Sequence, residues 1–167
     1  MNACPTIVLR KLEPDDLPLL YLWENDTDAW LDGSTHNPLS KDDLRDYILR
    51  TTGDIFKDEQ LRLMICPAAD GEPVGCVDLY DVDIRNRKAA VAIYIAPAYR
   101  RQGLAREALR QLKTYVTDIL CFRLLYVMVR KSNKISVCLF QSVGFQNVAC
   151  LPNWLNEDDI FVLQTIL

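Results

Sequence analysis

The chain has 167 residues, of which half are apolar and one quarter are charged, and its formal net charge is −4. This length favours one domain over residues 1–167 with a single substantial core. The acidic total disfavours general nucleic-acid binding. No apolar run approaches the ~20 residues that a membrane span needs, and the N-terminus lacks the pattern of a secretory signal. We therefore expect a cytoplasmic protein that binds neither membrane nor nucleic acid.

Charge is distributed unevenly along the chain. Residues 1–83 contain 18 acidic and 7 basic residues, whereas residues 84–167 contain 5 acidic and 12 basic residues. One interpretation is that the first half faces a cation and the second half faces an anion. The other is an ordinary solvated surface, and the sequence leaves both open.

Cysteine and histidine usage argues against metal and hydrolase chemistry. None of the six cysteines forms a C-x-x-C pair, and most lie in apolar runs. This predicts buried, reduced thiols rather than a zinc site or a disulfide framework. His36 is the only histidine, so a multi-histidine metal centre is excluded and a Ser-His-Asp hydrolase is disfavoured. We expect no bound metal.

The first third of the chain predicts one strand and two helices. Residues 6–12 have a strand pattern, and a helix is expected to follow, with Pro14 near its first turn. A polar loop then covers residues 26–38. Ser40 with Asp43 three positions later resembles a capping box, which predicts a second helix that ends at a glycine.

After residue 60 the apolar residues follow the two-residue period of strands, and helices and strands then alternate along the chain. Three β-type runs between residues 60 and 96 predict an antiparallel meander, and its last strand, Ala90–Ile95, is apolar enough to be central. A helix over 103–120, a strand over Phe122–Arg130, a short helix stopped by Gly144 and a closing strand follow. The order β-α-α-β-β-β-α-β-α-β-β indicates an α/β fold, in which helices pack on the faces of one mixed sheet.

The stretch IYIAPAYRRQGLAREAL, residues 93–109, joins the central strand to the clearest helix. A helix start offers unpaired N–H groups and the positive end of the dipole, and Gly103 places no side chain in the way of an anion. Arg100, Arg101 and Arg106 add positive charge at the same place. The pattern favours a ligand of pyrophosphate size, although solvated arginines would give the same pattern. The glycine motifs of dinucleotide folds and P-loops are missing.

Two motifs in the correct order give the chain a family resemblance. Arg100-x-x-Gly103-x-Ala105 after an apolar strand resembles the acyl-coenzyme A signature of the GCN5-related N-acetyltransferases, the GNAT superfamily. The segment NKISVCLFQSVGF, from Asn133 to Phe145, resembles a second segment of that family. The start IVLRKLEPDDLPLL is similar to the branch that contains ribosomal-protein and bacterial spermidine N-acetyltransferases. The resemblance covers nearly the whole chain and implies the single-domain GNAT fold, with a mixed, mostly antiparallel sheet flanked by about four helices.

The resemblance implies that acetyl-CoA is the co-substrate. Main-chain N–H groups of the arginine loop and helix start would hold its pyrophosphate, and the strand around Tyr94 would pair with the pantetheine arm like an added strand. Asn133 would contact the same arm, cap the helix that follows, or do both. The implied cofactor-binding residues are Ile93, Tyr94, Ile95, Arg100, Arg101, Gln102, Gly103, Leu104, Ala105, Arg106 and Asn133.

One catalytic group of the family is replaced in this chain. We expect an N–H from the Tyr94–Ile95 region to stabilise the developing oxyanion. Phe140 occupies the position where many members carry a tyrosine that donates a proton, and a phenyl ring cannot donate. We expect a slower or differently assisted enzyme, unless Phe140 is simply a core residue. The substitute donors are Cys138, Ser136, Tyr126 and water.

The base and the acceptor site are left open. The central strand lacks the glutamate that related enzymes often carry there, so Asp78, with Asp81 and Asp83 beside it, is a candidate base through water or a surface group. His36 is a weaker candidate for a base. The predicted substrate-binding residues are Glu24, Asp28, Asp32 and His36.

These patterns and the resemblance predict an acetyl-CoA-dependent N-acetyltransferase that acts on a primary amine. The acidic first half makes a polyamine-like or other small cationic amine the first choice of acceptor, and a protein N-terminal amine is the alternative. A non-catalytic acyl-CoA-binding module and a structural interaction domain are alternatives of other classes. A homodimer also remains open, because dimers are common in the family.

Overall fold

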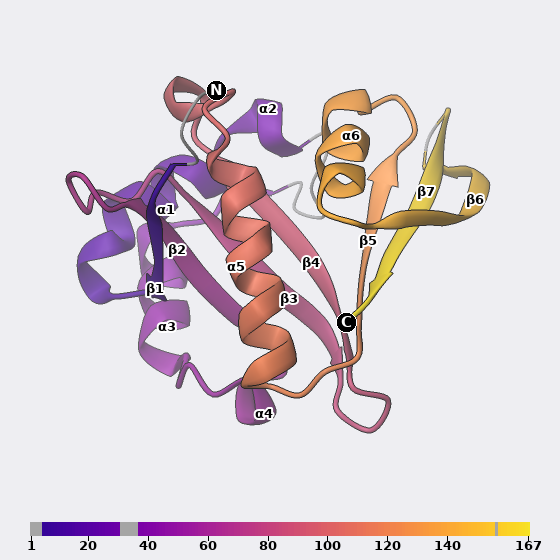
Figure 1. Cartoon of the computed structure of the whole chain (residues 1–167). Helices are drawn as coiled ribbons and strands as arrows, with labels where there is room; N and C mark the ends of the chain where they lie inside the picture. Colours follow the sequence, from indigo (N-terminus) through magenta and orange to yellow (C-terminus); the bar gives the residue numbers. More distant parts are fainter. Residues whose placement is uncertain (1–4, 31–36, 156) are drawn as a thin grey trace.

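The computed structural model describes residues 5–30, 37–155 and 157–167. They form one seven-stranded sheet with helices on both faces (Figure 1). The strands are β1 Ile7–Lys11, β2 Leu61–Pro67, β3 Gly75–Asp83, β4 Lys88–Ile95, β5 Leu124–Arg130, β6 Gln146–Leu155 and β7 Asp158–Ile166. The helices are α1 Leu17–Glu24, α2 Thr27–Trp30, α3 Lys41–Arg50, α4 Ile55–Asp58, α5 Leu104–Asp118 and α6 Lys134–Ser142.

The sheet has the strand order β1-β2-β3-β4-β5-β7-β6, and every neighbouring pair is antiparallel except β4 and β5. Short connections join β2 to β3 and β3 to β4, as the predicted meander requires. β4 and β5 are parallel because the chain crosses between them through α5, which runs back along the sheet. The predicted mixed, mostly antiparallel sheet is confirmed.

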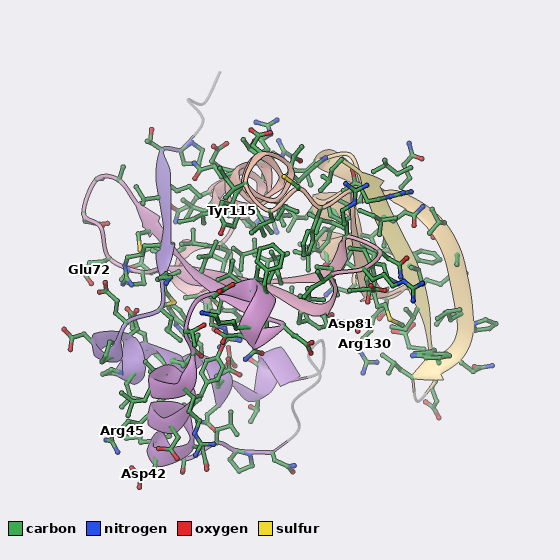
Figure 2. The ribbon with its side chains drawn as sticks, turned by 90° about the horizontal axis from the view of Figure 1, so that it is seen from below. Asp42, Arg45, Glu72, Asp81, Tyr115 and Arg130 are labelled. Carbon is green, nitrogen blue, oxygen red and sulfur yellow. The ribbon has the colours of Figure 1, made fainter. Side chains whose placement is uncertain are left out.

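The helices divide between the two faces of the sheet. Figure 2 shows α5, with Tyr115, on one side and α3, with Asp42 and Arg45, on the other. α5 contacts β1, β2 and β4 as well as α6, whereas α1 packs against α3. The face under α5 will be called the α5 face, and the face under α1 and α3 will be called the α1 face.

The core follows the two-residue period of β4. Ala89, Val91 and Ile95 belong to the large apolar cluster that includes the buried residues of α5. Tyr94 packs instead into a second cluster that contains Trp23 of α1. Because successive side chains of a strand point to opposite faces, β4 is covered on both sides, as expected of a central strand.

The predicted elements agree with the structure in most of their bounds. In the part of the chain that the structure describes, four helices have eight or more residues, namely α1, α3, α5 and α6, which matches the expected number. The capping box is confirmed, since the Ser40 hydroxyl accepts from the Asp43 N–H at 3.1 Å and the Asp43 carboxylate accepts from the Ser40 N–H at 3.0 Å. Among the described residues, no helix has the length and apolar character that crossing a membrane requires.

Two predictions about the fold were wrong. The predicted loop over residues 26–38 contains the short helix α2, and α4 begins directly after Gly53 because the Asp54 side chain accepts from the Phe56 N–H at 3.0 Å. The prediction of buried thiols holds for two of the described cysteines and fails for three, which lie on the outer side of an element or in a turn. The buried ones are Cys66 and Cys76, and the exposed ones are Cys121, Cys138 and Cys150.

Gly75 gives a test of how closely β3 and β4 are packed. A Cβ at this position would lie 2.1 Å from the backbone oxygen of Tyr94, so β4 would have to shift. We expect Gly75→Ala to lower the free energy of unfolding by ~1–3 kcal/mol, as overpacking does. Gly71→Asn is the control, because nothing lies within 4 Å of that site and asparagine tolerates its positive φ of 76°. Urea unfolding measures both variants, and equal stability of Gly75→Ala and wild type would contradict the packing.

Candidate active site

β4 and β5 pair over only three residues and then separate. The pairs are Lys88 with Leu124, Ala89 with Leu125 and Ala90 with Tyr126. On its other side β4 stays paired with β3 as far as Ile95. Figure 1 shows the two strands adjacent near the C-terminus of the chain and apart at their far ends. The β5-facing backbone of residues 91–95 therefore has no strand partner, and an extended ligand could pair with it.

The loop between β4 and α5 places a helix start beside this free backbone. Arg101 and Gly103 both adopt left-handed backbone conformations, with φ of 63° and 81°, and Gly103 is the N-cap of α5. The first backbone bond of the helix runs from the Glu107 N–H to the Gly103 carbonyl at 3.1 Å. The N–H groups of the first helical turn, residues 104–106, consequently have no acceptor within the helix and form an anion-binding position.

The arginines of the loop have different roles. The Arg100 Nε donates to the Ile95 carbonyl at 2.8 Å, and its guanidinium lies 5.8 Å from the centre of the Tyr94 ring. Arg100 therefore ties the loop to the end of β4. Arg101 is exposed beside the helix start, and the Arg106 Nε donates to the Ser142 hydroxyl of α6 at 3.2 Å.

α6 completes one side of this region. Arg106 lines a shallow groove of about 410 Å³ together with Lys134, Ile135, Cys138 and Leu139. The Asn133 side chain accepts from the Ser136 N–H at 3.0 Å, so the structure gives it the N-cap role. Its contact with a coenzyme remains a prediction.

Phe140 lies in the core. It is 1% exposed and packs edge-on against Phe145, with ring centroids 5.1 Å apart. A donor placed on this phenyl position would have to emerge from the packed interior. The interpretation of Phe140 as a core residue therefore accounts for its environment.

The α1 face carries a half-buried ion cluster on α1, β2 and β3. The Arg62 guanidinium donates to both oxygens of Asp78, at 2.7 and 2.9 Å, and to Glu24 at 2.5 Å. It also lies 5.8 Å from the centre of the Tyr47 ring. Burial alone would lower the pKa of Arg62, but Asp78 and Glu24 together raise it well above its ordinary value. The arginine is therefore a fixed cation between two carboxylates.

This cluster bears on two predicted site residues. Both oxygens of Asp78 accept from Arg62, so the structure places it as an ion-pair partner and no contact favours the predicted role of a base. Glu24 is likewise paired with Arg62. Asp28 is exposed in α2. Asp32 and His36 lie outside the described residues.

Tyr94 belongs to the unpaired stretch of β4 by its backbone and to the α1 face by its side chain. Its hydroxyl donates to Asp26 at 3.1 Å, and its ring packs on Trp23 with centroids 5.7 Å apart. Burial, reinforced by the hydrogen bond to Asp26, raises the pKa of Tyr94 to about 12. The hydroxyl therefore stays protonated at neutral pH and holds α1 against the strand whose backbone is free on the β5 side.

Sequence reasoning missed Arg62 and Asp26 as parts of this region. A lone arginine inside the apolar run LRLMICP is the one sequence signal that pointed to Arg62. For Asp26 there was none, because its partner Tyr94 is 68 positions away. The Tyr126 hydroxyl, a candidate substitute donor, donates a hydrogen bond to Asp81, a candidate base.

A model of the acetyltransferase (GNAT) domain matches residues 6–146 of this chain. The chain belongs to the GNAT acetyltransferase family. Spermidine N(1)-acetyltransferase of Escherichia coli K12 is 26% identical over 148 residues, which cover 87% of this chain and 75% of that protein. The corresponding protein of Vibrio cholerae is 25% identical over 139 residues, covering 83% of this chain and 78% of that protein.

Solved structures agree with this fold. Spermidine N-acetyltransferase from V. cholerae in complex with CoA and spermine superimposes with a TM-score of 0.82 at 23% identity, covering 96% of this chain and 95% of that chain. A dodecameric structure of the V. cholerae enzyme gives a TM-score of 0.80 at 23% identity, covering 96% and 93%. This GNAT chain is accordingly an N-acetyltransferase with acetyl-CoA as co-substrate. The free β4 backbone and the unpaired N–H groups of α5 fit a carrier whose extended arm leads to a diphosphate.

Removal of Arg62 tests the half-buried ion cluster of this GNAT protein. Its side chain is 17% exposed, and Arg62→Met would remove the cation that Asp78 and Glu24 share. We expect the free energy of unfolding to fall by ~3–5 kcal/mol. Arg50→Met is the control, because Arg50 and Asp46 form an exposed pair, which is worth ~0–1 kcal/mol. Chemical denaturation measures both variants. A cluster without structural importance would give the same small loss in each.

Proposed function

We propose that this acetyltransferase transfers the acetyl group of acetyl-CoA to a polyamine-like or other small cationic amine. The observation that carries the proposal is the break in β4–β5 pairing, which leaves free strand backbone beside an unpaired helix start. Curated relatives at 25–26% identity are spermidine acetyltransferases, which supports the acceptor class. The acidic residues of the α1 face support it as well, because carboxylates near the site favour a cation.

In this proposal the coenzyme lies along β4 and across the start of α5. Backbone groups of Ile93, Tyr94 and Ile95 pair with the pantetheine arm, and main-chain N–H groups of residues 102–106 hold the pyrophosphate. Exposed Arg101 adds charge, whereas Arg100 acts indirectly by fixing the loop to β4. A backbone N–H near Ile95 stabilises the oxyanion.

The chemistry requires a neutral amine. An alkyl ammonium has a pKa of ~10.4, so deprotonation at pH 7 requires roughly 4–5 kcal/mol. As the nitrogen attacks the thioester carbon, the C–S bond breaks and its electron pair goes to sulfur. A thiol has a pKa of ~8.5, so thiolate can leave without an acid at position 140. The greater need is therefore a route for the proton on nitrogen.

A non-catalytic acyl-CoA-binding module is the second candidate. It is favoured by the burial of Phe140 in place of a tyrosine donor. It predicts coenzyme binding without thiol release for every amine. A cytoplasmic location and a homodimer also stay predictions, and the dodecameric V. cholerae relative makes higher assembly the better starting expectation.

Thiol release from acetyl-CoA tests the proposed activity. We expect release that depends on an added amine, with spermidine and spermine above aminoglycosides, amino acids and N-terminal peptides. The measurement is a colorimetric thiol assay with mass analysis of the acetylated product. Preference for an N-terminal peptide would overturn the acceptor class, and binding without release for the whole panel would favour the non-catalytic module.

Charge reversal in the loop tests the binding mode. Arg101→Glu places an anion beside the helix start, and we expect the Kd for acetyl-CoA to rise at least tenfold, since a charge-assisted contact is worth ~1.5–3 kcal/mol. Arg110→Glu makes the same charge change at an exposed position further along α5. Calorimetric titration compares the two variants. Equal affinities would place the pyrophosphate elsewhere.

A further inference from the structure

A row of three residues crosses the sheet where β4 and β5 part. Tyr80 of β3 pairs with Ala90 of β4, and Ala90 pairs with Tyr126 of β5. Their neighbours Leu79, Ala89 and Leu125 lie in the core on the α5 face. Side chains alternate along each strand, so the three residues of the row face the α1 side. Ala90–Tyr126 is also the last β4–β5 pair, so Tyr126 stands at the vertex of the separation.

A bulge in β3 brings a carboxylate to this row. The register shifts between Tyr80 and Asp83, and Asp81 adopts a left-handed conformation with φ of 48°. Bulges often redirect a side chain beside an active site, and a non-glycine residue rarely adopts this conformation. Here the redirected side chain reaches across β4, because the Tyr126 hydroxyl donates to the Asp81 carboxylate.

Exposure to solvent increases from Ala90 through Tyr126 to Asp81. Ala90, which lies between the two tyrosines in the row, is 1% exposed and has only a methyl group as side chain. Tyr126 is half-buried, whereas Asp81 is exposed. The hydrogen bond thus runs from a partly enclosed hydroxyl at the vertex to a carboxylate in contact with water.

We propose that Tyr126 and Asp81 form a proton relay that takes the proton from the acceptor nitrogen. This inference rests on the proposed acetyl transfer. As the new C–N bond forms, the nitrogen becomes acidic and gives its proton to the Tyr126 oxygen, while Tyr126 passes its own proton to Asp81 and on to water. The electron pair of the breaking C–S bond leaves with sulfur, so charge and atoms balance.

Other features of the structure agree with this direction of transfer. The hydroxyl already donates to Asp81, so only the acceptor nitrogen has to approach the tyrosine oxygen. Burial, together with the carboxylate partner, raises the pKa of Tyr126, and the hydroxyl is protonated before the reaction. Of the other two carboxylates on β3, Asp78 is occupied by Arg62 and Asp83 accepts from the backbone and side chain of Asn86. Phe140 has no proton to exchange.

The test compares Tyr126→Phe, Asp81→Asn and the double variant, with Tyr115→Phe as the control. Tyr115 lies on α5, on the opposite face of the sheet (Figure 2), and its loss should leave kcat unchanged. We expect each relay variant to lose ~10²-fold in kcat, the lower end of general-base effects. The KM for acetyl-CoA should stay within twofold. The double variant should be no slower than the single ones, because the two residues act as one unit.

Two readouts separate a relay from a purely structural hydrogen bond. Across acceptors of falling pKa the kcat loss of Tyr126→Phe should shrink, since a less basic nitrogen gives up its proton more easily. Added formate should raise the kcat of Asp81→Ala at least tenfold. A structural bond would give equal losses for all acceptors, no rescue by formate and a lowered Tm.

The outcomes also distinguish this inference from the proposed function. If wild type releases no thiol with any amine while binding acetyl-CoA, the acetyl transfer itself is wrong and the relay falls with it. If wild type is active and Tyr126→Phe keeps its kcat, only the relay is overturned.

Discussion

The short parallel contact between β4 and β5 is the constraint on which the rest of the structure depends. β4 pairs along its length with β3, and β5 pairs along its length with β7, but the two strands share only three residue pairs. Each strand is hydrogen-bonded to its outer neighbour, so both stay in the sheet although they do not pair with each other beyond Ala90 and Tyr126. Unpaired strand backbone is usually a liability in a folded protein. Here the crossover helix α5 begins beside it, and the two free sets of backbone groups together suit an extended anionic ligand.

The two faces of the sheet have different chemistry at this point. The α5 face is apolar beneath the helix, and its basic groups near the helix start are Arg100, Arg101 and Arg106. On the α1 face Glu24, Asp26, Asp78 and Asp81 gather around β3 and β4, held by Arg62 and by tyrosine hydroxyls. All four carboxylates come from the acidic first half of the chain, and the arginine loop comes from the basic second half. Folding therefore gathers carboxylates from the first half of the chain around β3 and β4 and arginines from the second half at the start of α5.

Proton handling sets the clearest limit on the chemistry of this chain. Phe140, which the sequence predicts to stand at the position of a family tyrosine, is packed in the core and cannot donate a proton. A thiolate can leave without an acid more easily than an ammonium can react without a base. The carboxylate with the most direct claim by position, Asp78, is neutralised by Arg62. Tyr126 and Asp81 are the pair that geometry leaves with one end at the strand vertex and the other in water. The family chemistry can thus persist with its proton route moved to a different strand.

The sequence by itself determined the element order, the family and the loop with Gly103, because strand and helix periods, cap residues and the two motifs are local patterns. It did not determine which carboxylates are neutralised. Arg62 meets Glu24 and Asp78 over 38 and 16 positions, and Tyr126 meets Asp81 over 45. These contacts depend on strand register, on the bulge at which Asp81 takes a left-handed conformation, and on the face of the sheet to which each side chain points. Register, bulges and side-chain orientation are set by tertiary structure. The sequence could therefore predict the backbone elements of the candidate site, β4 and the start of α5, but the fold decided its side-chain contacts.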